Sequence, residues 1–208
     1  MSDSDITIRQ GAYLPHWTKE GASYFVTFHL GDSIPQTVLE QWKYTRDDIL
    51  GRAKQQGRLL SSEELTRLAV LREEKIERYL DVGHGACWMK RDDIAAMVSG
   101  AVQFFADKRY TLFPWSVMPN HVHITFRPLP SFTLPGILQS WKSYTSHEAN
   151  KILGRQGDFW HRESYDHLIR DEDDFNRCAA YVLANAVRAG LHDWPWQGLG
   201  SAGVPPAP

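Results

Sequence analysis

The stretch Met118–Arg127, MPNHVHITFR, decides the fold. A Pro-Asn turn signal is followed by residues that alternate between polar and apolar, which is typical of a strand with one buried face. Successive side chains on a strand point to opposite faces, so His121 and His123 project from one face while Val122 and Ile124 cover a core on the other. The stretch therefore predicts a strand with two imidazoles on the face away from that core.

Strand and helix signals alternate on both sides of this strand. Runs of β-branched and aromatic residues predict strands at 24–30, 110–118, 121–127 and 165–170, and Pro114 suggests an edge or a bulge. Helix patterns and capping signals, among them the capping box Ser61-x-x-Glu64, predict helices at about 35–55, 61–80, 92–107, 133–153 and 171–190. This order predicts an α+β fold, an antiparallel sheet with helices packed on it. The helices between the first two strands exceed one crossover, so we expect a helical elaboration within about 35–106.

Length and composition fit one globular domain over residues 1–197. The chain has 208 residues, of which 42% are apolar and 23% charged. The first ten residues look loose, 11–17 are expected to form an irregular ordered loop, and 198–208, rich in Gly and Pro, are expected to be a disordered tail. The helices between about 41 and 81 interleave both charge signs, which favours solvated faces.

Charge and targeting signals exclude several classes of protein. There are 23 Lys and Arg against 25 Asp and Glu, a net charge of −2, so any nucleic-acid site must come from a local arrangement of basic residues. The two cysteines do not form a disulfide framework, the N-terminus lacks a signal-peptide pattern, and no apolar run reaches membrane-spanning length. These observations predict a cytoplasmic protein without a membrane segment.

The last helix carries a second group of polar residues. Tyr181 and Asn185 are one turn apart, and Arg177 and Arg188 fall on the same stripe as Tyr181. A separate stripe is apolar and is expected to face the core; it comprises Phe175, Cys178, Ala179, Val182 and Ala186. Each polar group alone also has an interpretation without function. The two histidines could simply lie near a sheet edge, and Tyr181 and Asn185 could be ordinary surface residues.

Together, the two groups point to phosphodiester chemistry. Two imidazoles and the Asn185 amide oxygen can hold a divalent cation and leave positions open for phosphate oxygens. Mg²⁺ or Mn²⁺ fits this donor set better than structural zinc, which prefers four nitrogen or sulfur ligands. A phenol has a pKa of about 10, so Tyr181 would have to be aimed at phosphorus to act as a nucleophile. Arg177 and Arg188 could then grip phosphates.

These residues resemble a known family. Met118–His123 (MPNHVH) is similar to the His-hydrophobic-His signature of the single-tyrosine HUH transposases. Tyr181–Leu191 (YVLANAVRAGL) is similar to the tyrosine helix of one branch, the REP-associated tyrosine transposases. Further marks of that branch occur in order, and the resemblance spans about Gly11 to Trp196; they are GAYLPH at 11–16, YFVTF at 24–28, FWHRE at 159–163 and YDHLIRD at 165–171.

The resemblance implies a ferredoxin-like core and a concrete reaction. Family members cut single-stranded DNA beside hairpins of repetitive extragenic palindromes and form a 5′-phosphotyrosine with a free 3′ hydroxyl. Carried over, Tyr181 would be the nucleophile, and His121, His123 and Asn185 would bind Mg²⁺ or Mn²⁺. The family leans toward a monomer with its tyrosine in cis, with a homodimer as the alternative. One departure is Ala186, where the branch usually has Pro after the Asn, which restores a backbone N–H.

Other residues and functions compete with this reading. Lys142 and Arg162 join Arg177 and Arg188 as candidate DNA contacts, and Tyr144 is a rival nucleophile. His147, His161 and His167 could also approach the site. One alternative function is non-catalytic binding of hairpin DNA. Another is a two-histidine phosphoesterase, whose two His-x-Thr units would be 123–125 and 16–18.

Overall fold

The structure is a computed structural model that describes residues 7–10, 15–72 and 76–201. The strands are β1 (Thr7–Gln10), β2 (Pro15–Thr18), β3 (Tyr24–His29), β4 (Tyr110–Val117), β5 (His121–Pro128), β6 (Tyr165–Leu168) and β7 (Gln197–Gly198). The helices are α1 (Gln36–Gln55), α2 (Ser62–Arg72), α3 (Arg78–Val82), the 3₁₀ helix η3 (Trp88–Lys90), α4 (Asp92–Phe104), α5 (Leu134–Leu153) and α6 (Glu172–Arg188). None of the described helices is both long and apolar enough to cross a membrane.

The central sheet has the order β6-β3-β5-β4-β7, and its neighbouring strands are antiparallel. With α4 and α5 as the crossovers, this is the ferredoxin-like arrangement, which confirms the predicted α+β class. The register of the two central strands places Thr27 opposite His123 and His29 opposite His121. The pairing of β4 shifts between Leu112 and Trp115, so the expected irregularity around Pro114 is a bulge.

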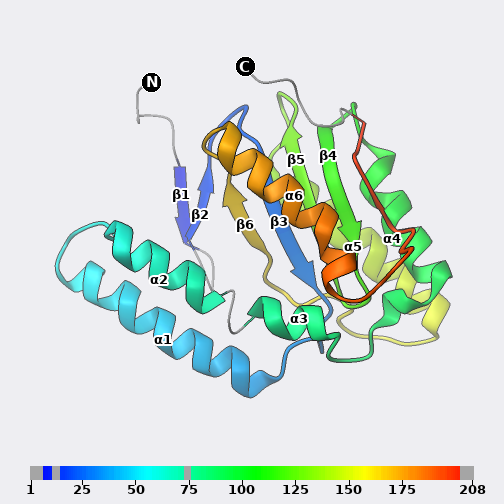
Figure 1. Cartoon of the computed structure of the whole chain (residues 1–208), viewed down its shortest axis with the longest axis horizontal. Coiled ribbons are helices and arrows are strands. Elements are labelled where there is room, and N and C mark those ends of the chain that lie inside the picture. The colour runs from blue at the N-terminus through cyan, green and yellow to red at the C-terminus, as the bar shows by residue number, and fades with distance from the viewer. Residues whose placement is uncertain (1–6, 11–14, 73–75, 202–208) are drawn as a thin grey trace.

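The two faces of the sheet differ in what covers them. Figure 1 shows α6 across one face and α4 with α5 against the other. The main core lies under α4 and α5, where Val26, Val122 and Ile124 are fully buried with residues of both helices. On the α6 face, Phe113 packs edge-on against Phe175, with ring centroids 5.1 Å apart. The α6 face is therefore the one on which β5 presents its histidines.

The predicted elaboration divides into two parts. Helix α4 belongs to the main core, whereas α1 and α3 share a smaller core that comprises Ile34, Val38, Leu39, Trp42, Ile76 and Leu80. The segment 61–80, predicted as one helix, contains α2 and the start of α3, and residues 73–75 between them lie outside the described residues. Leu80 packs in the smaller core with residues of α1, while Glu77 reaches the α6 face, where it contacts Tyr181.

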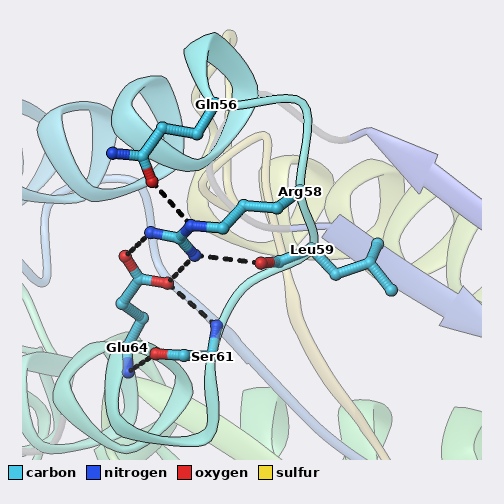
Figure 2. A network of polar contacts seen from close by, with 5 residues as sticks. All are labelled: Gln56, Arg58, Leu59, Ser61 and Glu64. Carbon is cyan, nitrogen blue, oxygen red and sulfur yellow. Dashed lines mark hydrogen bonds and ion pairs between the residues drawn. The ribbon is translucent and has the colours of Figure 1, made fainter.

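The turn between α1 and α2 is fixed by polar contacts (Figure 2). The predicted capping box forms, because Glu64 N donates to Ser61 Oγ at 3.1 Å and Ser61 N donates to Glu64 Oε2 at 2.8 Å. The Arg58 guanidinium donates to both carboxylate oxygens of Glu64 and to the Leu59 carbonyl. These contacts join the end of α1 to the start of α2.

Both ends of the chain are more regular than the sequence indicated. Strands β1 and β2 form an antiparallel pair with Thr7 opposite Thr18, so 7–10 are not loose and 15–17 begin a strand; 11–14 lie outside the described residues. The segment 198–201 lies on the sheet rather than in a disordered tail, because β7 pairs with β4 and Ser201 Oγ donates to Asp107 Oδ1 at 2.8 Å. Gly200 has φ +80°, and a Cβ there would lie 2.3 Å from the Leu112 oxygen. Its glycine thus permits close packing rather than disorder.

Candidate active site

Strand β5 brings three polar side chains to the α6 face. His121, His123 and Thr125 are fully buried, although all three are polar. The two imidazole rings lie 4.5 Å apart between centroids, at an angle of 74°. The alternation expected from the sequence therefore places both rings side by side beneath α6.

Neighbouring residues fix the proton of His121. Asn120 Nδ2 donates to the His84 carbonyl at 2.9 Å, which leaves Asn120 Oδ1 facing His121 Nδ1 at 2.7 Å. Only a ring N–H can pair with that oxygen, so Nδ1 carries the proton and Nε2 carries a lone pair. Within the described chain, the buried Nε2 of His121 makes no hydrogen bond. This is the state in which an imidazole binds a metal ion.

Burial keeps two histidines of this face, His121 and His29, uncharged. Burial lowers the pKa of His121 well below its usual value, the adjacent His123 lowers it further, and Asn185 acts in the opposite direction. His29 lies in the next strand and stacks on His161 with ring centroids 4.7 Å apart. Burial, with a smaller contribution from His161, lowers the pKa of His29 to about 3.

These shifts predict an acid-sensitive fold. The unfolded chain protonates His29 and His121 near pH 6.5, whereas the folded chain resists doing so, so the unfolded state binds more protons below that pH. We expect the free energy of unfolding to fall as the pH drops from about 6.5 toward 4, by up to about 1.4 kcal/mol per pH unit for each histidine. Urea unfolding in chelator measures this, and His29→Gln should flatten part of the slope. A profile independent of pH would contradict the prediction.

Helix α6 carries the tyrosine toward the histidines. The helix begins at the cap Asp171, whose side chain accepts from Asp174 N at 2.8 Å, and its first turn is acidic as expected. Its buried stripe, which sets the rotation of the helix, comprises Phe175, Ala179, Val182, Asn185 and Ala186. The Tyr181 ring then lies 5.2 Å from the His123 ring and 5.8 Å from the Phe25 ring, between centroids. Nucleophile candidate and histidines thus meet within one chain.

Asn185 lies one turn further along the same helix and is fully buried. Its Nδ2 donates to Asp81 Oδ1 at 3.4 Å, and its Oδ1 makes no hydrogen bond to the described residues. The helix continues past Ala186, with Ala189 N bonded to the Asn185 carbonyl at 3.0 Å. The missing proline therefore does not displace the amide from the site.

Two acidic residues complete the surroundings, and the sequence interpretation missed both. Glu77 is 5% exposed, and its Oε2 accepts from the Tyr181 hydroxyl at 3.0 Å and lies 3.9 Å from His123 Nε2. Asp81 is partly buried, and burial followed by the nearby Glu77 raises the pKa of its carboxyl. Their spacing of four residues, equal to that of Tyr181 and Asn185, was the available signal. The mixed charge of the region had instead indicated a solvated face.

The donor set suits a divalent cation. Imidazole nitrogens, the Asn185 amide oxygen and a carboxylate lie on one buried face, and two of these groups, His121 Nε2 and Asn185 Oδ1, lack hydrogen bonds within the described residues. Buried polar atoms are normally satisfied, so these two atoms are available to a further ligand. Mixed nitrogen and oxygen donors fit Mg²⁺ or Mn²⁺.

A second group of potential metal ligands, His167, Asp174 and Cys178, lies at the start of α6. The Asp174 carboxylate already accepts from His167 Nε2 at 2.8 Å, Arg170 N at 3.1 Å and Arg177 at 3.1 Å. Burial raises the pKa of Cys178 to about 12, which keeps it a thiol. This group is therefore better explained as the link between β6 and α6.

The candidate DNA contacts fall in different surroundings. The Arg188 guanidinium lies 5.2 Å over the Tyr181 ring and is half exposed. Arg177 pairs with Asp174 but stays 69% exposed, and Arg162 is exposed. Lys142 Nζ donates to the carbonyls of His161 and Arg162 at 2.8 and 2.7 Å, and burial lowers its pKa to about 8. Lys142 thus holds the loop before β6 instead of presenting a cation to solvent.

The rival residues lie elsewhere. Tyr144 is 54% exposed on α5, which covers the opposite face of the sheet (Figure 1). His147 is exposed on the same helix. The second His-x-Thr unit, 16–18, lies in β2, which pairs with β1 and not with the central sheet. The strand pairing therefore does not place the two units side by side, as the phosphoesterase alternative requires.

Comparisons with known proteins find similarity to transposases. Residues 88–185 match the family model described as "Transposase IS200 like". A solved structure of a REP-associated tyrosine transposase bound to a REP hairpin is similar to this one. The alignment covers 88% of this chain and 79% of that chain, with 15% sequence identity and a TM-score of 0.50. A candidate transposase from Deinococcus radiodurans R1 aligns over 78% of this chain and 89% of its own, with 12% identity and a TM-score of 0.28. No curated protein matches the sequence significantly. The matched family segment begins in η3 and contains both histidines, Tyr181 and Asn185, so this part of the chain is similar to the IS200-like transposases, and the fold is similar to that of a REP-associated tyrosine transposase.

Proposed function

We propose that the protein is a metal-dependent endonuclease and strand transferase for single-stranded DNA, which acts through a 5′-phosphotyrosine. One observation carries the proposal: the Tyr181 ring lies 5.2 Å from His123, whose ring lies 4.5 Å from His121. A tyrosine beside two buried imidazoles places a phenol next to potential metal ligands. Its chemistry is that of a positioned nucleophile next to a cation site.

Tyr181 would attack the phosphorus through its phenolic oxygen. The reaction forms the bond between this oxygen and phosphorus and breaks the bond from phosphorus to O3′. One proton leaves Tyr181 and one joins the departing oxygen, which becomes a free 3′ hydroxyl. A phenol has an ordinary pKa of about 10, so the reaction depends on how the hydroxyl is oriented toward phosphorus. Contacts with Phe25 and Arg188 hold the ring, and the hydrogen bond to Glu77 fixes the hydroxyl.

His121, His123 and Asn185 would hold Mg²⁺ or Mn²⁺. When bound, the cation polarises the phosphodiester and offsets the charge that develops in the transition state. The proton on His121 Nδ1 is fixed by Asn120, which leaves Nε2 available as a ligand. Asp81 holds the Asn185 amide through its NH₂ group, which leaves the amide oxygen available. Both arrangements exist before any metal arrives, so little reorganisation is required.

The substrate we propose is single-stranded DNA next to a hairpin of palindromic repeats. The similar solved transposase is bound to a REP hairpin, and the two folds align over most of both chains. The net charge of −2 leaves phosphate binding to local residues, and Arg188, Arg177 and Arg162 are the exposed candidates. Because Tyr181 and the histidines come from one chain, a monomer can supply the complete site.

The test is a hairpin oligonucleotide with single-stranded flanks, incubated with the protein and Mn²⁺. With a 3′-end label, we expect a labelled protein–DNA band that survives denaturation, because the protein retains the 5′ phosphate of the downstream fragment. With a 5′-end label, we expect a shorter free strand ending in a 3′ hydroxyl. Tight binding without an adduct would favour a non-catalytic hairpin-binding protein. An adduct carrying only the 5′ label would contradict the proposed polarity.

A further inference from the structure

Helix α3, part of the helical insertion, places two carboxylates against α6 with matched spacing. Glu77 immediately precedes this helix and meets Tyr181, and Asp81 meets Asn185 one turn later. Glu77 and Asp81 are four residues apart, as are Tyr181 and Asn185, so one turn at the start of α3 lies in register against one turn of α6. The insertion therefore reaches directly into the site that the sheet and α6 form.

Glu77 lies between the candidate nucleophile and a candidate metal ligand. Its Oε2 is 3.0 Å from the Tyr181 hydroxyl and 3.9 Å from His123 Nε2. Two ligand atoms at about 2.1 Å from one cation can be at most about 4.2 Å apart, so this carboxylate and His123 can share one. A carboxylate only 5% exposed is costly to bury, and a neighbouring divalent cation offsets that cost.

We infer that Glu77 is an anionic ligand that completes the cation site and that it positions the Tyr181 hydroxyl through the same carboxylate. The inference rests on the proposed function. Two imidazoles and an amide form an uncharged donor set, and a carboxylate oxygen is the ligand type that Mg²⁺ and Mn²⁺ prefer. Asp81 does not bind the cation itself; it is a positioning residue that accepts a hydrogen bond from the Asn185 amide. The insertion thereby supplies part of the site and couples its own folding to metal binding.

Calorimetric titration with MnCl₂, in the absence of DNA, tests the inference on the full chain. We expect Glu77→Gln to weaken Mn²⁺ binding by about tenfold or more, because glutamine keeps the size and the hydrogen-bond acceptor but removes the charge. Glu40→Gln is the matched control, since this glutamate is exposed on α1 of the same insertion, and it should leave the affinity unchanged. The visible spectrum of bound Co²⁺ should also change in Glu77→Gln, since it reports the ligand set.

Glu77→Asp separates loss of a ligand from loss of folding. It keeps the charge on a shorter side chain, so we expect it to bind Mn²⁺ more tightly than Glu77→Gln, whereas a folding defect would weaken both variants alike. Wild-type affinity and an unchanged Co²⁺ spectrum in Glu77→Gln would overturn the role of Glu77 alone. If the wild-type chain bound no Mn²⁺, or if replacing His121 and His123 left binding unchanged, the cation site of the proposed function would fail as well.

Discussion

Tyr181→Phe is expected to abolish the covalent protein–DNA adduct and to lower cleavage by at least about 1,000-fold, because removal of a nucleophile leaves only binding and electrostatic effects. The substitution keeps the aromatic ring, so the contacts with Phe25, His123 and the Arg188 guanidinium remain. Only the hydroxyl and its hydrogen bond to Glu77 are lost. Affinity for a hairpin oligonucleotide should therefore change by less than about threefold. Denaturing gels measure the adduct, and fluorescence anisotropy measures binding.

Tyr144→Phe is the matched control for this prediction. Tyr144 lies on α5, on the face of the sheet opposite α6, and is 54% exposed. Its phenol is the alternative nucleophile that the sequence left open, and we expect its removal to leave the adduct unchanged. An adduct that persists in Tyr181→Phe but disappears in Tyr144→Phe would assign the reaction to the other helix.

The parts of the site that the sequence predicted are those that depend on local periodicity. Alternation around Val122 was enough to place His121 and His123 on one face of a strand, since a strand has only two faces. Helical spacing likewise placed Tyr181 and Asn185 on one stripe, because an apolar stripe elsewhere on the same helix fixed its rotation. Neither pattern by itself related the strand to the helix. The family resemblance supplied that step, and the structure places the centroids of the Tyr181 and His123 rings 5.2 Å apart.

The parts that the sequence did not predict depend on contacts distant in the chain. Glu77 and Tyr181 are separated by 104 positions, and the four-residue spacing of Glu77 and Asp81 does not by itself relate these residues to α6. The helices between about 41 and 81 were expected to present solvated faces because their charges are mixed. Lys142 was expected to contact DNA because it is basic. Its ammonium group instead donates hydrogen bonds to the carbonyls of His161 and Arg162. Gly200 indicated a flexible end, whereas its positive φ permits close packing against β4.

Replacing His121 and His123 together by Ala is expected to remove both the response to Mg²⁺ or Mn²⁺ and the cleavage activity. Both imidazoles are fully buried. The hydrogen bond from His121 Nδ1 to Asn120 keeps the proton on Nδ1, so that Nε2 has a free lone pair. Alanine removes these ligands without offering others, so Asn185 and Glu77 alone cannot keep the cation at the site. We expect cleavage to fall by about 1,000-fold or more at any metal concentration, since the charge on the phosphodiester is no longer offset. Cleavage assays over a range of Mn²⁺ concentrations, and in chelator, measure this.

The interpretation of that double variant depends on separating metal loss from instability. Two alanines in a buried site leave voids that cost roughly 2 to 5 kcal/mol each, so the assay must be run where circular dichroism shows the variant to be folded. His147→Ala with His192→Ala is the matched control, because it removes two exposed imidazoles and should leave the metal response intact. Undiminished cleavage by the folded double variant in chelator would show that neither imidazole nor a divalent cation acts on the phosphate. Tyr181 would then need another source of charge stabilisation, and Arg188, whose guanidinium lies 5.2 Å over its ring, is the nearest candidate for that role on the described surface of α6.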